Sequence, residues 1–129
     1  MSYQGANFNL LGVDDWDAHR FDHRYKADLE QTYQQIDQSL FSILLAHQPK
    51  AAKQADQLKI DLQLSGHTHG GQIFPLHAFV AYDQKYNRGI FHLNHLVLYV
   101  SEGTGYWGPP VRIATRAEIS VLRLQQAVS

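Results

Sequence analysis

The chain has 129 residues, a formal net charge of −1, 44% hydrophobic residues and no cysteine. This length fits one domain with enough apolar residues for a core, and the near-zero charge gives no electrostatic case for nucleic acid, whose binding proteins usually carry a clustered basic face. The lack of cysteine excludes a disulfide framework and a thiolate metal site, and no apolar run approaches the ~18 residues of a membrane-spanning helix.

The first part of the chain predicts an alternation of strands and helices. Residues 8–13 form an apolar run that predicts a short strand, and the polar, histidine-bearing segment 16–24 predicts an irregular loop. Residues 27–39 predict a helix because apolar side chains recur there at helical spacing. Residues 41–46 then predict a buried strand.

The second part continues this alternation and adds a hairpin. A proline at a first helical turn predicts a short helix over residues 49–57, and residues 60–65 predict the next strand. Residues 72–81 are apolar but interrupted by a proline, so they predict no single regular element. The last expected elements are the hairpin strands 89–94 and 95–101 and a terminal strand, 118–124. This order predicts an α/β fold with functional residues beyond the carboxyl ends of its strands.

Two histidines stand two positions apart in the glycine-framed segment from Gly66 to Gly71. The glycines predict a tight turn after a strand, from which the rings of His67 and His69 can diverge toward neighbouring metals. His47 follows another strand, and neutral imidazole is the commonest protein ligand of divalent metals. These three histidines are therefore candidate metal ligands; the alternative is that they are hydrogen-bonded structural residues.

The remaining histidines have no convergent partners in the sequence. Such histidines are usually structural or exposed, so no metal role is expected for His19, His23, His77, His92 and His95. Gln48 and Gln72 follow motif histidines and are candidates for orienting their rings.

Three ordered segments carry a family resemblance: Leu-Ala-His-Gln-Pro at 45–49, Leu-Ser-Gly-His-Thr-His-Gly-Gly-Gln at 64–72 and Gly-Tyr-Trp-Gly-Pro-Pro-Val-Arg at 105–112. Together they resemble the C-terminal half of calcineurin-like metallophosphoesterases, and most closely the bacterial membrane-associated phosphodiesterase branch. The resemblance extends from about Asn7 to about Leu124. It implies a partial metallophosphoesterase sandwich, half of a two-sheet core flanked by helices, in which residues 1–129 form one domain.

The resemblance implies a site with two divalent metals, manganese, iron or zinc, in which His47 and His67 bind one ion and His69 binds the other. The family's other ligands come from an Asp-x-His, a Gly-Asp and a Gly-Asn-His-Asp motif, and none of these occurs in this sequence. Asp14 and Asp15 resemble a later strand end rather than the bridging aspartate. The histidine that protonates the leaving group is expected in the missing motifs, so no catalytic residue is assigned here.

The implied function is that of the C-terminal part of a dinuclear phosphoesterase, which hydrolyses phosphate mono- or diesters with a metal-activated water. Three histidines spread over two sites do not hold two ions ~3.5–4 Å apart, so the chain is expected to be inactive alone. Two alternatives stay open: a nucleotide-sugar lipid pyrophosphatase of the same fold, and a standalone, non-catalytic metal-binding module.

The glycine- and proline-rich segment 103–110 predicts a rigid loop, which the resemblance places beside the active site. There Tyr106 or Trp107 would line a substrate pocket, and Arg112 would pair with a phosphate through its planar fork of donors. The alternative is that Trp107 belongs to the core and that Arg112 caps a strand end or pairs with Glu118.

Half of a two-sheet core is expected to expose sheet edges, and self-association through them is a further expectation. The resemblance allows a membrane-associated parent protein, while this chain itself is expected to be soluble.

Overall fold

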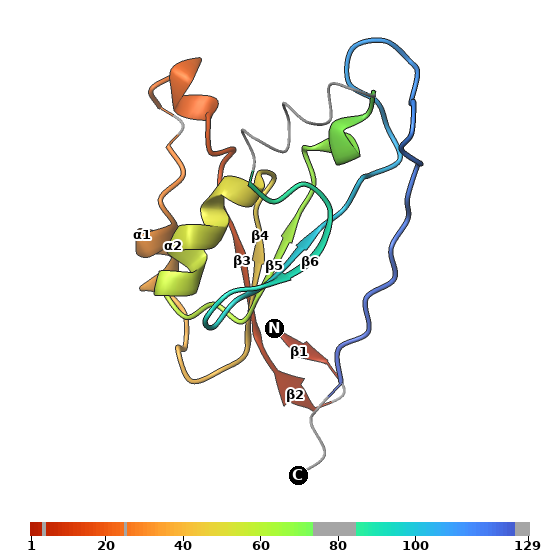
Figure 1. The fold of residues 1–129 in the computed structure, drawn as a ribbon. Helices are drawn as coiled ribbons and strands as arrows, with labels where there is room; N and C mark the ends of the chain where they lie inside the picture. Colours follow the sequence, from red (N-terminus) through yellow and green to blue (C-terminus); the bar gives the residue numbers. More distant parts are fainter. Residues whose placement is uncertain (4, 25, 74–84, 126–129) are drawn as a thin grey trace.

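The structure, a computed structural model, describes residues 1–3, 5–24, 26–73 and 85–125 (Figure 1). Its strands are β1 Ser2–Tyr3, β2 Ala6–Asn7, β3 Asn9–Gly12, β4 Ser42–Leu45, β5 Leu62–Ser65, β6 Gly89–His92 and β7 Val97–Val100. Its α-helices are α1 Leu29–Tyr33 and α2 Ala52–Gln57, and its 3₁₀ helices are Ala18–Arg20, Pro49–Ala51 and His69–Gly71.

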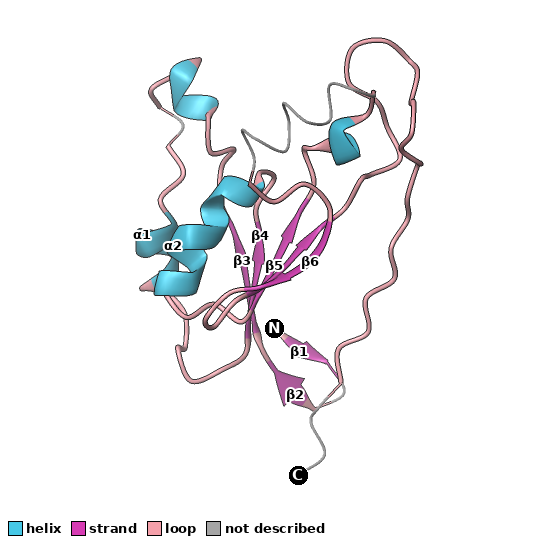
Figure 2. Cartoon of the chain, in the orientation of Figure 1, coloured by secondary structure: helices cyan, strands magenta, loops and turns pink. Residues whose placement is uncertain are grey.

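A five-stranded mixed sheet forms the centre of the structure, in the order β3-β4-β5-β7-β6. The strands β3, β4, β5 and β7 run parallel, and β6 runs antiparallel to β7. The helices α1 and α2 lie on one side of this sheet (Figure 2). The α/β class predicted from the sequence is confirmed.

The core lies between the helices and one face of the sheet. Leu44 in the middle of β4 pairs with Leu11 of β3 and is fully buried, as is Leu29 of α1. Burying a leucine side chain stabilises the fold by about 1.5–3 kcal/mol. The small side chains of Ala52 and Ala55 are also fully buried, which lets α2 lie close to the sheet.

Most of the predicted elements are present. The strands expected at 8–13, 41–46 and 60–65 correspond to β3, β4 and β5, and the helix at 49–57 is a 3₁₀ turn followed by α2. The predicted hairpin is β6 and β7, closed by a hydrogen bond of 2.9 Å from Leu93 N to Leu96 O. The loop 16–24 contains one 3₁₀ turn. Residues 74–84, which include most of the irregular segment and His77, lie outside the described residues.

The helix predicted over 27–39 was too long, because α1 ends at Tyr33. Its start is capped by Asp28, whose side chain accepts a hydrogen bond of 2.9 Å from Gln31 N. Further on, Asp37 Oδ1 accepts hydrogen bonds from the backbone and the hydroxyl of Ser39, at 3.0 and 2.6 Å. Such local bonds give the backbone an alternative to the helix, and turns replace its second half.

The terminal strand predicted over 118–124 was wrong, because these residues form no strand. Both edges of β7 are already occupied, by β5 and by β6. The segment instead contacts β7 through side chains: Tyr99 Oη bonds to Glu118 and to Ser120. Apolar and polar residues alternate in 118–124 as in a strand, but this segment has no neighbouring strand with a free edge to pair with.

The face of the sheet that points away from the helices is only partly covered. The strand register places Leu10, Leu45 and Ile90 on this outer face, where they are 43%, 45% and 60% exposed. The only other sheet among the described residues is the short hairpin of β1 and β2.

Candidate metal site

The candidate site lies beyond the carboxyl ends of β4 and β5. His47 comes two residues after β4 and His67 comes two residues after β5. Their backbones stay together past the sheet, because Gly66 N donates to His47 O at 3.1 Å and Ser65 Oγ donates to Ala46 O at 2.7 Å. Parallel, in-register strands thus bring the two histidines side by side, as is common for sites in open α/β sheets.

The imidazoles of His47 and His67 face each other through nitrogen atoms. Nδ1 of His67 lies 3.1 Å from Nε2 of His47, and the ring planes are inclined at 78°. Two nitrogens that each bind one zinc ion at ~2.0–2.1 Å in tetrahedral geometry lie at a similar separation from each other. The same distance is that of an N–H···N hydrogen bond, so the pair is compatible both with one divalent metal and with the alternative of hydrogen-bonded structural histidines.

The environment favours the neutral form of His67. Burial lowers the pKa of its imidazole, and the neighbouring His47 lowers it further, while Asp15 has the opposite effect. A metal ligand must be the neutral imidazole.

The backbone around the histidines has an unusual conformation. His67, His69 and Gln72 have φ of +71°, +49° and +44°. Such a left-handed backbone costs about 1–3 kcal/mol per non-glycine residue and clusters at functional sites.

Asp15 approaches the histidine pair, which the sequence patterns do not predict. Its Oδ2 lies 4.0 Å from His47 Nε2, and its Oδ1 accepts a hydrogen bond of 3.0 Å from Gln48 Nε2. The signal that points to it is its place after β3, the neighbour of β4. Within residues 1–3, 5–24, 26–73 and 85–125, no three His, Asp or Glu side chains close around one point as a metal cage.

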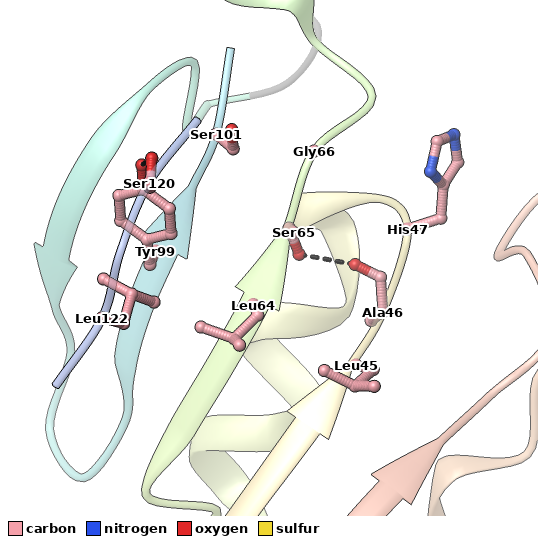
Figure 3. Close-up of a pocket in the computed structure, with 10 residues that line it drawn as sticks. All are labelled: Leu45, Ala46, His47, Leu64, Ser65, Gly66, Tyr99, Ser101, Ser120 and Leu122. Atoms are coloured by element: carbon pink, nitrogen blue, oxygen red, sulfur yellow. Dashed lines mark hydrogen bonds between the residues drawn. The ribbon is translucent and has the colours of Figure 1, made fainter. Parts of the chain in front are cut away.

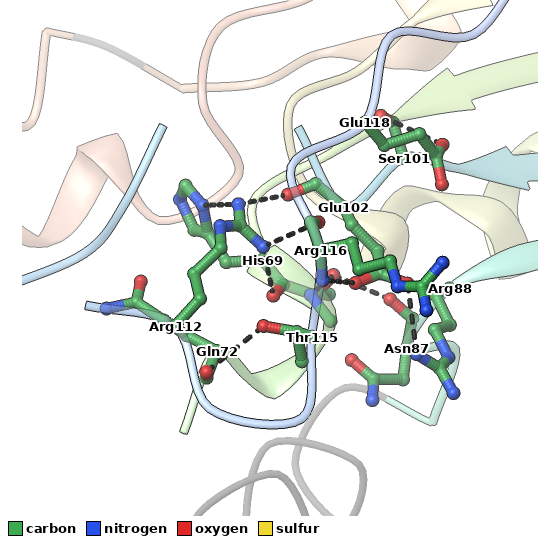
Figure 4. Close-up of polar contacts among 12 residues, drawn as sticks. His69, Gln72, Asn87, Arg88, Ser101, Glu102, Arg112, Thr115, Arg116 and Glu118 are labelled. Atoms are coloured by element: carbon green, nitrogen blue, oxygen red, sulfur yellow. Dashed lines mark hydrogen bonds and ion pairs between the residues drawn. The ribbon is translucent and has the colours of Figure 1, made fainter. Parts of the chain in front are cut away.

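His69 begins the 3₁₀ turn His69–Gly71 and contacts Arg112. Its Nδ1 is 3.4 Å from Arg112 Nη2 (Figure 4). Burial lowers the pKa of His69 and the positive charge of Arg112 lowers it further, whereas a hydrogen bond with the Gly105 backbone raises it. The net effect again favours a neutral imidazole.

The loop after β7 is tied to the end of the histidine turn by Gln72. Its Nε2 donates to Trp107 O at 2.7 Å and to Pro109 O at 3.2 Å, and its Oε1 accepts from Trp107 N. Trp107 is 73% exposed and Tyr106 is 59% exposed. Trp107 is therefore not a core residue, and both aromatic rings stand on a loop with a fixed backbone.

The two candidate ring-orienting glutamines make other contacts. The side chain of Gln48 bonds to Asp15, and that of Gln72 bonds to the Trp107 loop. Arg112 directs its guanidinium at backbone carbonyls, and the bonds of Glu118 go to Tyr99, Ser120 and Ser101. The alternative in which Arg112 pairs with Glu118 is thus not observed, and Arg112 bonds to the backbone instead.

A hollow of about 430 Å³ opens beside His47 on the outer face of the sheet (Figure 3). Its walls combine aliphatic side chains of β4 and β5 with polar groups from β7 and the C-terminal segment. The residues that line it are Leu45, Ala46, His47, Leu64, Ser65, Gly66, Tyr99, Ser101, Ser120 and Leu122.

Across the part of the chain that is described, no helix is long and apolar enough to cross a membrane.

Similarity to curated proteins identifies the family. The chain is 43% identical over 121 residues to an uncharacterized metallophosphoesterase of Helicobacter pylori, a match that covers 92% of the chain and 32% of that protein. It is 44% identical over 124 residues to a transmembrane protein with metallophosphoesterase domain of Danio rerio, covering 92% of the chain and 28% of that protein. It is 38% identical over 102 residues to the uncharacterized metallophosphoesterase YkuE of Bacillus subtilis, covering 76% of the chain and 36% of that protein.

The chain thus spans about a third of the length of these relatives. No protein-family model matches it, and no solved structure matches it at the significance that the curated relatives reach. The relatives include bacterial and animal proteins, so they do not single out the bacterial membrane-associated branch. On the agreement of these relatives over most of its length, the chain belongs to the metallophosphoesterase family.

Proposed function

We propose that this chain is the C-terminal part of a dinuclear metal-dependent phosphoesterase that hydrolyses phosphate mono- or diesters. In this proposal His47 and His67 hold one divalent ion and His69 contributes to a second. The observation that supports it is the 3.1 Å separation of His67 Nδ1 and His47 Nε2, which is close to the separation of two nitrogens bound to one zinc ion. Ions bound there supply an activated water and polarise the phosphoryl oxygen.

The residues of this chain contribute binding and orientation. His67 contacts His47, whereas His69, in the same turn after β5, contacts Arg112, so we assign His69 to a second ion. We further propose that Tyr106 or Trp107 lines the substrate pocket, which their exposure on a loop held by Gln72 supports. Manganese, iron and zinc all suit imidazole ligands, so the donor set does not select one of them.

Metal binding by the histidine pair is tested by titrating the chain with Zn²⁺ in a calorimeter. We expect His47→Ala and His67→Ala to weaken binding at least about tenfold, because each removes one of two donors to the same ion. His92→Ala is the matched control: His92 is exposed and lies at the far end of β6, where it pairs with Val97. Equal Zn²⁺ affinity in all four proteins would exclude the proposed ligand pair.

Catalysis is tested separately, by hydrolysis of an activated phosphodiester with added Mn²⁺. We expect no hydrolysis above the metal-only background, because this chain supplies three histidines and lacks the family's remaining ligand motifs. Robust activity that His67→Ala abolishes would show that the chain is active by itself. Zn²⁺ binding without turnover agrees with the proposal and with a standalone metal-binding module, and activity of a longer chain separates these two.

A further inference from the structure

The guanidinium of Arg112 has all of its donors engaged within the chain. A guanidinium carries five N–H donors and no acceptor. Nε donates at 3.0 Å, Nη1 at 3.2 and 3.1 Å, and Nη2 at 2.8, 3.1 and 2.6 Å. The carbonyls that accept these bonds belong to His69, Glu102, Gly103, Gly105 and Arg116. No donor is left over for a substrate phosphate.

These carbonyls come from different parts of the chain. The carbonyl of His69 belongs to the histidine turn after β5, and the others belong to the segment that follows β7. Arg112 therefore joins the histidine turn to this segment across 43 positions of the sequence. Its planar fork suits such a role, because several carbonyls can bond to one rigid group.

The histidine turn needs support from outside. His69 has φ of +49°, and a non-glycine residue keeps such a backbone only when its surroundings hold it in place. On the side of Gly70, the support is the buried side chain of Glu102, which pairs with Arg88 at 3.0 Å. On the side of His69, it is Arg112.

We propose that Arg112 is a positioning residue for His69 rather than a ligand of substrate: its guanidinium fixes the backbone that presents the His69 imidazole to a divalent ion. This inference rests on the metal role proposed for His69. Lysine keeps the charge of Arg112 but concentrates three donors on one nitrogen, so Arg112→Lys does not restore the bonds to both segments.

The first test follows each imidazole by nitrogen NMR while Zn²⁺ is added to the 129-residue chain. In the unsubstituted chain we expect His47, His67 and His69 to respond. In Arg112→Met and Arg112→Lys, we expect His47 and His67 to respond as before and the apparent Zn²⁺ affinity at His69 to fall about tenfold or more. Arg123→Met, which removes an exposed arginine, is the matched control. Unchanged affinity at His69 in both Arg112 variants would overturn the inference.

Two metal-free measurements separate this inference from the proposed function. Amide hydrogen exchange at Gly71 and Gln72, whose N–H groups bond within the turn, is expected to quicken about tenfold in both Arg112 variants, with the amides of β5 unchanged. Unchanged exchange overturns the positioning role whether or not metal binds.

The second metal-free measurement adds inorganic phosphate to the unsubstituted chain. We expect the NMR signal of the Arg112 Nε–H to stay in place. A phosphate-dependent shift of that signal would make Arg112 a substrate ligand instead. Absence of any histidine response to Zn²⁺, with the exchange result as expected, counts against the proposed metal function alone.

Discussion

At the scale of single residues, Gly70 occupies a position that no other residue fits without cost. A Cβ at this position would lie 2.5 Å from Glu102 Oε2, and the backbone has φ of +62°. We expect Gly70→Ala to lower the free energy of unfolding by about 2–3 kcal/mol, since it combines left-handed strain with a clash against a buried carboxylate. Denaturant unfolding measures this loss.

A matched substitution separates the two causes. Gly89 has a positive φ of +89°, but a Cβ there would meet nothing within 4 Å. Gly89→Ala should therefore lose about 1 kcal/mol, from backbone strain alone. If the two variants lose the same free energy, the contact between Gly70 and Glu102 contributes nothing and the packing of the histidine turn described above is wrong.

At the scale of elements, Asp56 connects α2 to the hairpin of β6 and β7. Its Oδ1 accepts hydrogen bonds from His95 N at 2.8 Å and Leu96 N at 3.1 Å, and its Oδ2 accepts one from Asn94 Nδ2 at 2.9 Å. The backbone N–H of His95 is the main cause that lowers the pKa of Asp56, and the opposing effect of burial is smaller. One carboxylate thus holds the hairpin turn against the helix.

The lowered pKa of Asp56 makes stability depend on pH. Its contribution is fully present above the unfolded pKa of about 3.9 and is lost as the pH falls through the lower folded value. We expect Asp56→Asn to cost about 2 kcal/mol at neutral pH and to show a shallower loss of stability on acidification. Urea unfolding of both proteins between about pH 7 and pH 3 checks this, and two curves that stay parallel would contradict it.

At the scale of the whole molecule, the outer face of the sheet and the edge of β3 remain available for association. Leu10, Leu45 and Ile90 are exposed on this face, and within the described residues β3 is paired on one side only. Exposed apolar faces and free strand edges favour association with other chains. We therefore predict self-association, seen in sedimentation as a mass above the 14.7 kDa of one chain that increases with concentration.

A lysine on the outer face tests where this association occurs. Leu10 lies on β3, so Leu10→Lys would bury a charged side chain in the contact between two chains. We therefore expect this substitution to shift the population toward the monomer. Phe21→Lys is the control, since Phe21 is 92% exposed but belongs to a loop outside the sheet. A strictly monomeric, cooperatively folding chain would rule out the prediction.

Local sequence patterns predicted two kinds of element: strands that are continuous runs of apolar residues, and turns that depend on neighbouring residues. The apolar runs of β3, β4 and β5 and the turn near Asn94 were all visible before the structure. The helix over 27–39 was too long because bonds from Asp37 compete with it, and the strand over 118–124 failed because β7 has no free edge. The end of the helix is thus decided by one side chain, whereas the absence of the last strand is decided by the strand order of the whole sheet.

The sequence by itself determined the α/β class, the turn at residues 66–71 and the placement of histidines after two parallel strands, because spacing and glycine content are local properties. Only the tertiary structure decided that the rings of His47 and His67 contact each other while His69 lies against Arg112. It also decided that Asp15 approaches the pair and that Trp107 is exposed. These partners are as far apart as 43 positions in the chain, and which side chains meet over such distances depends on the order and register of the strands.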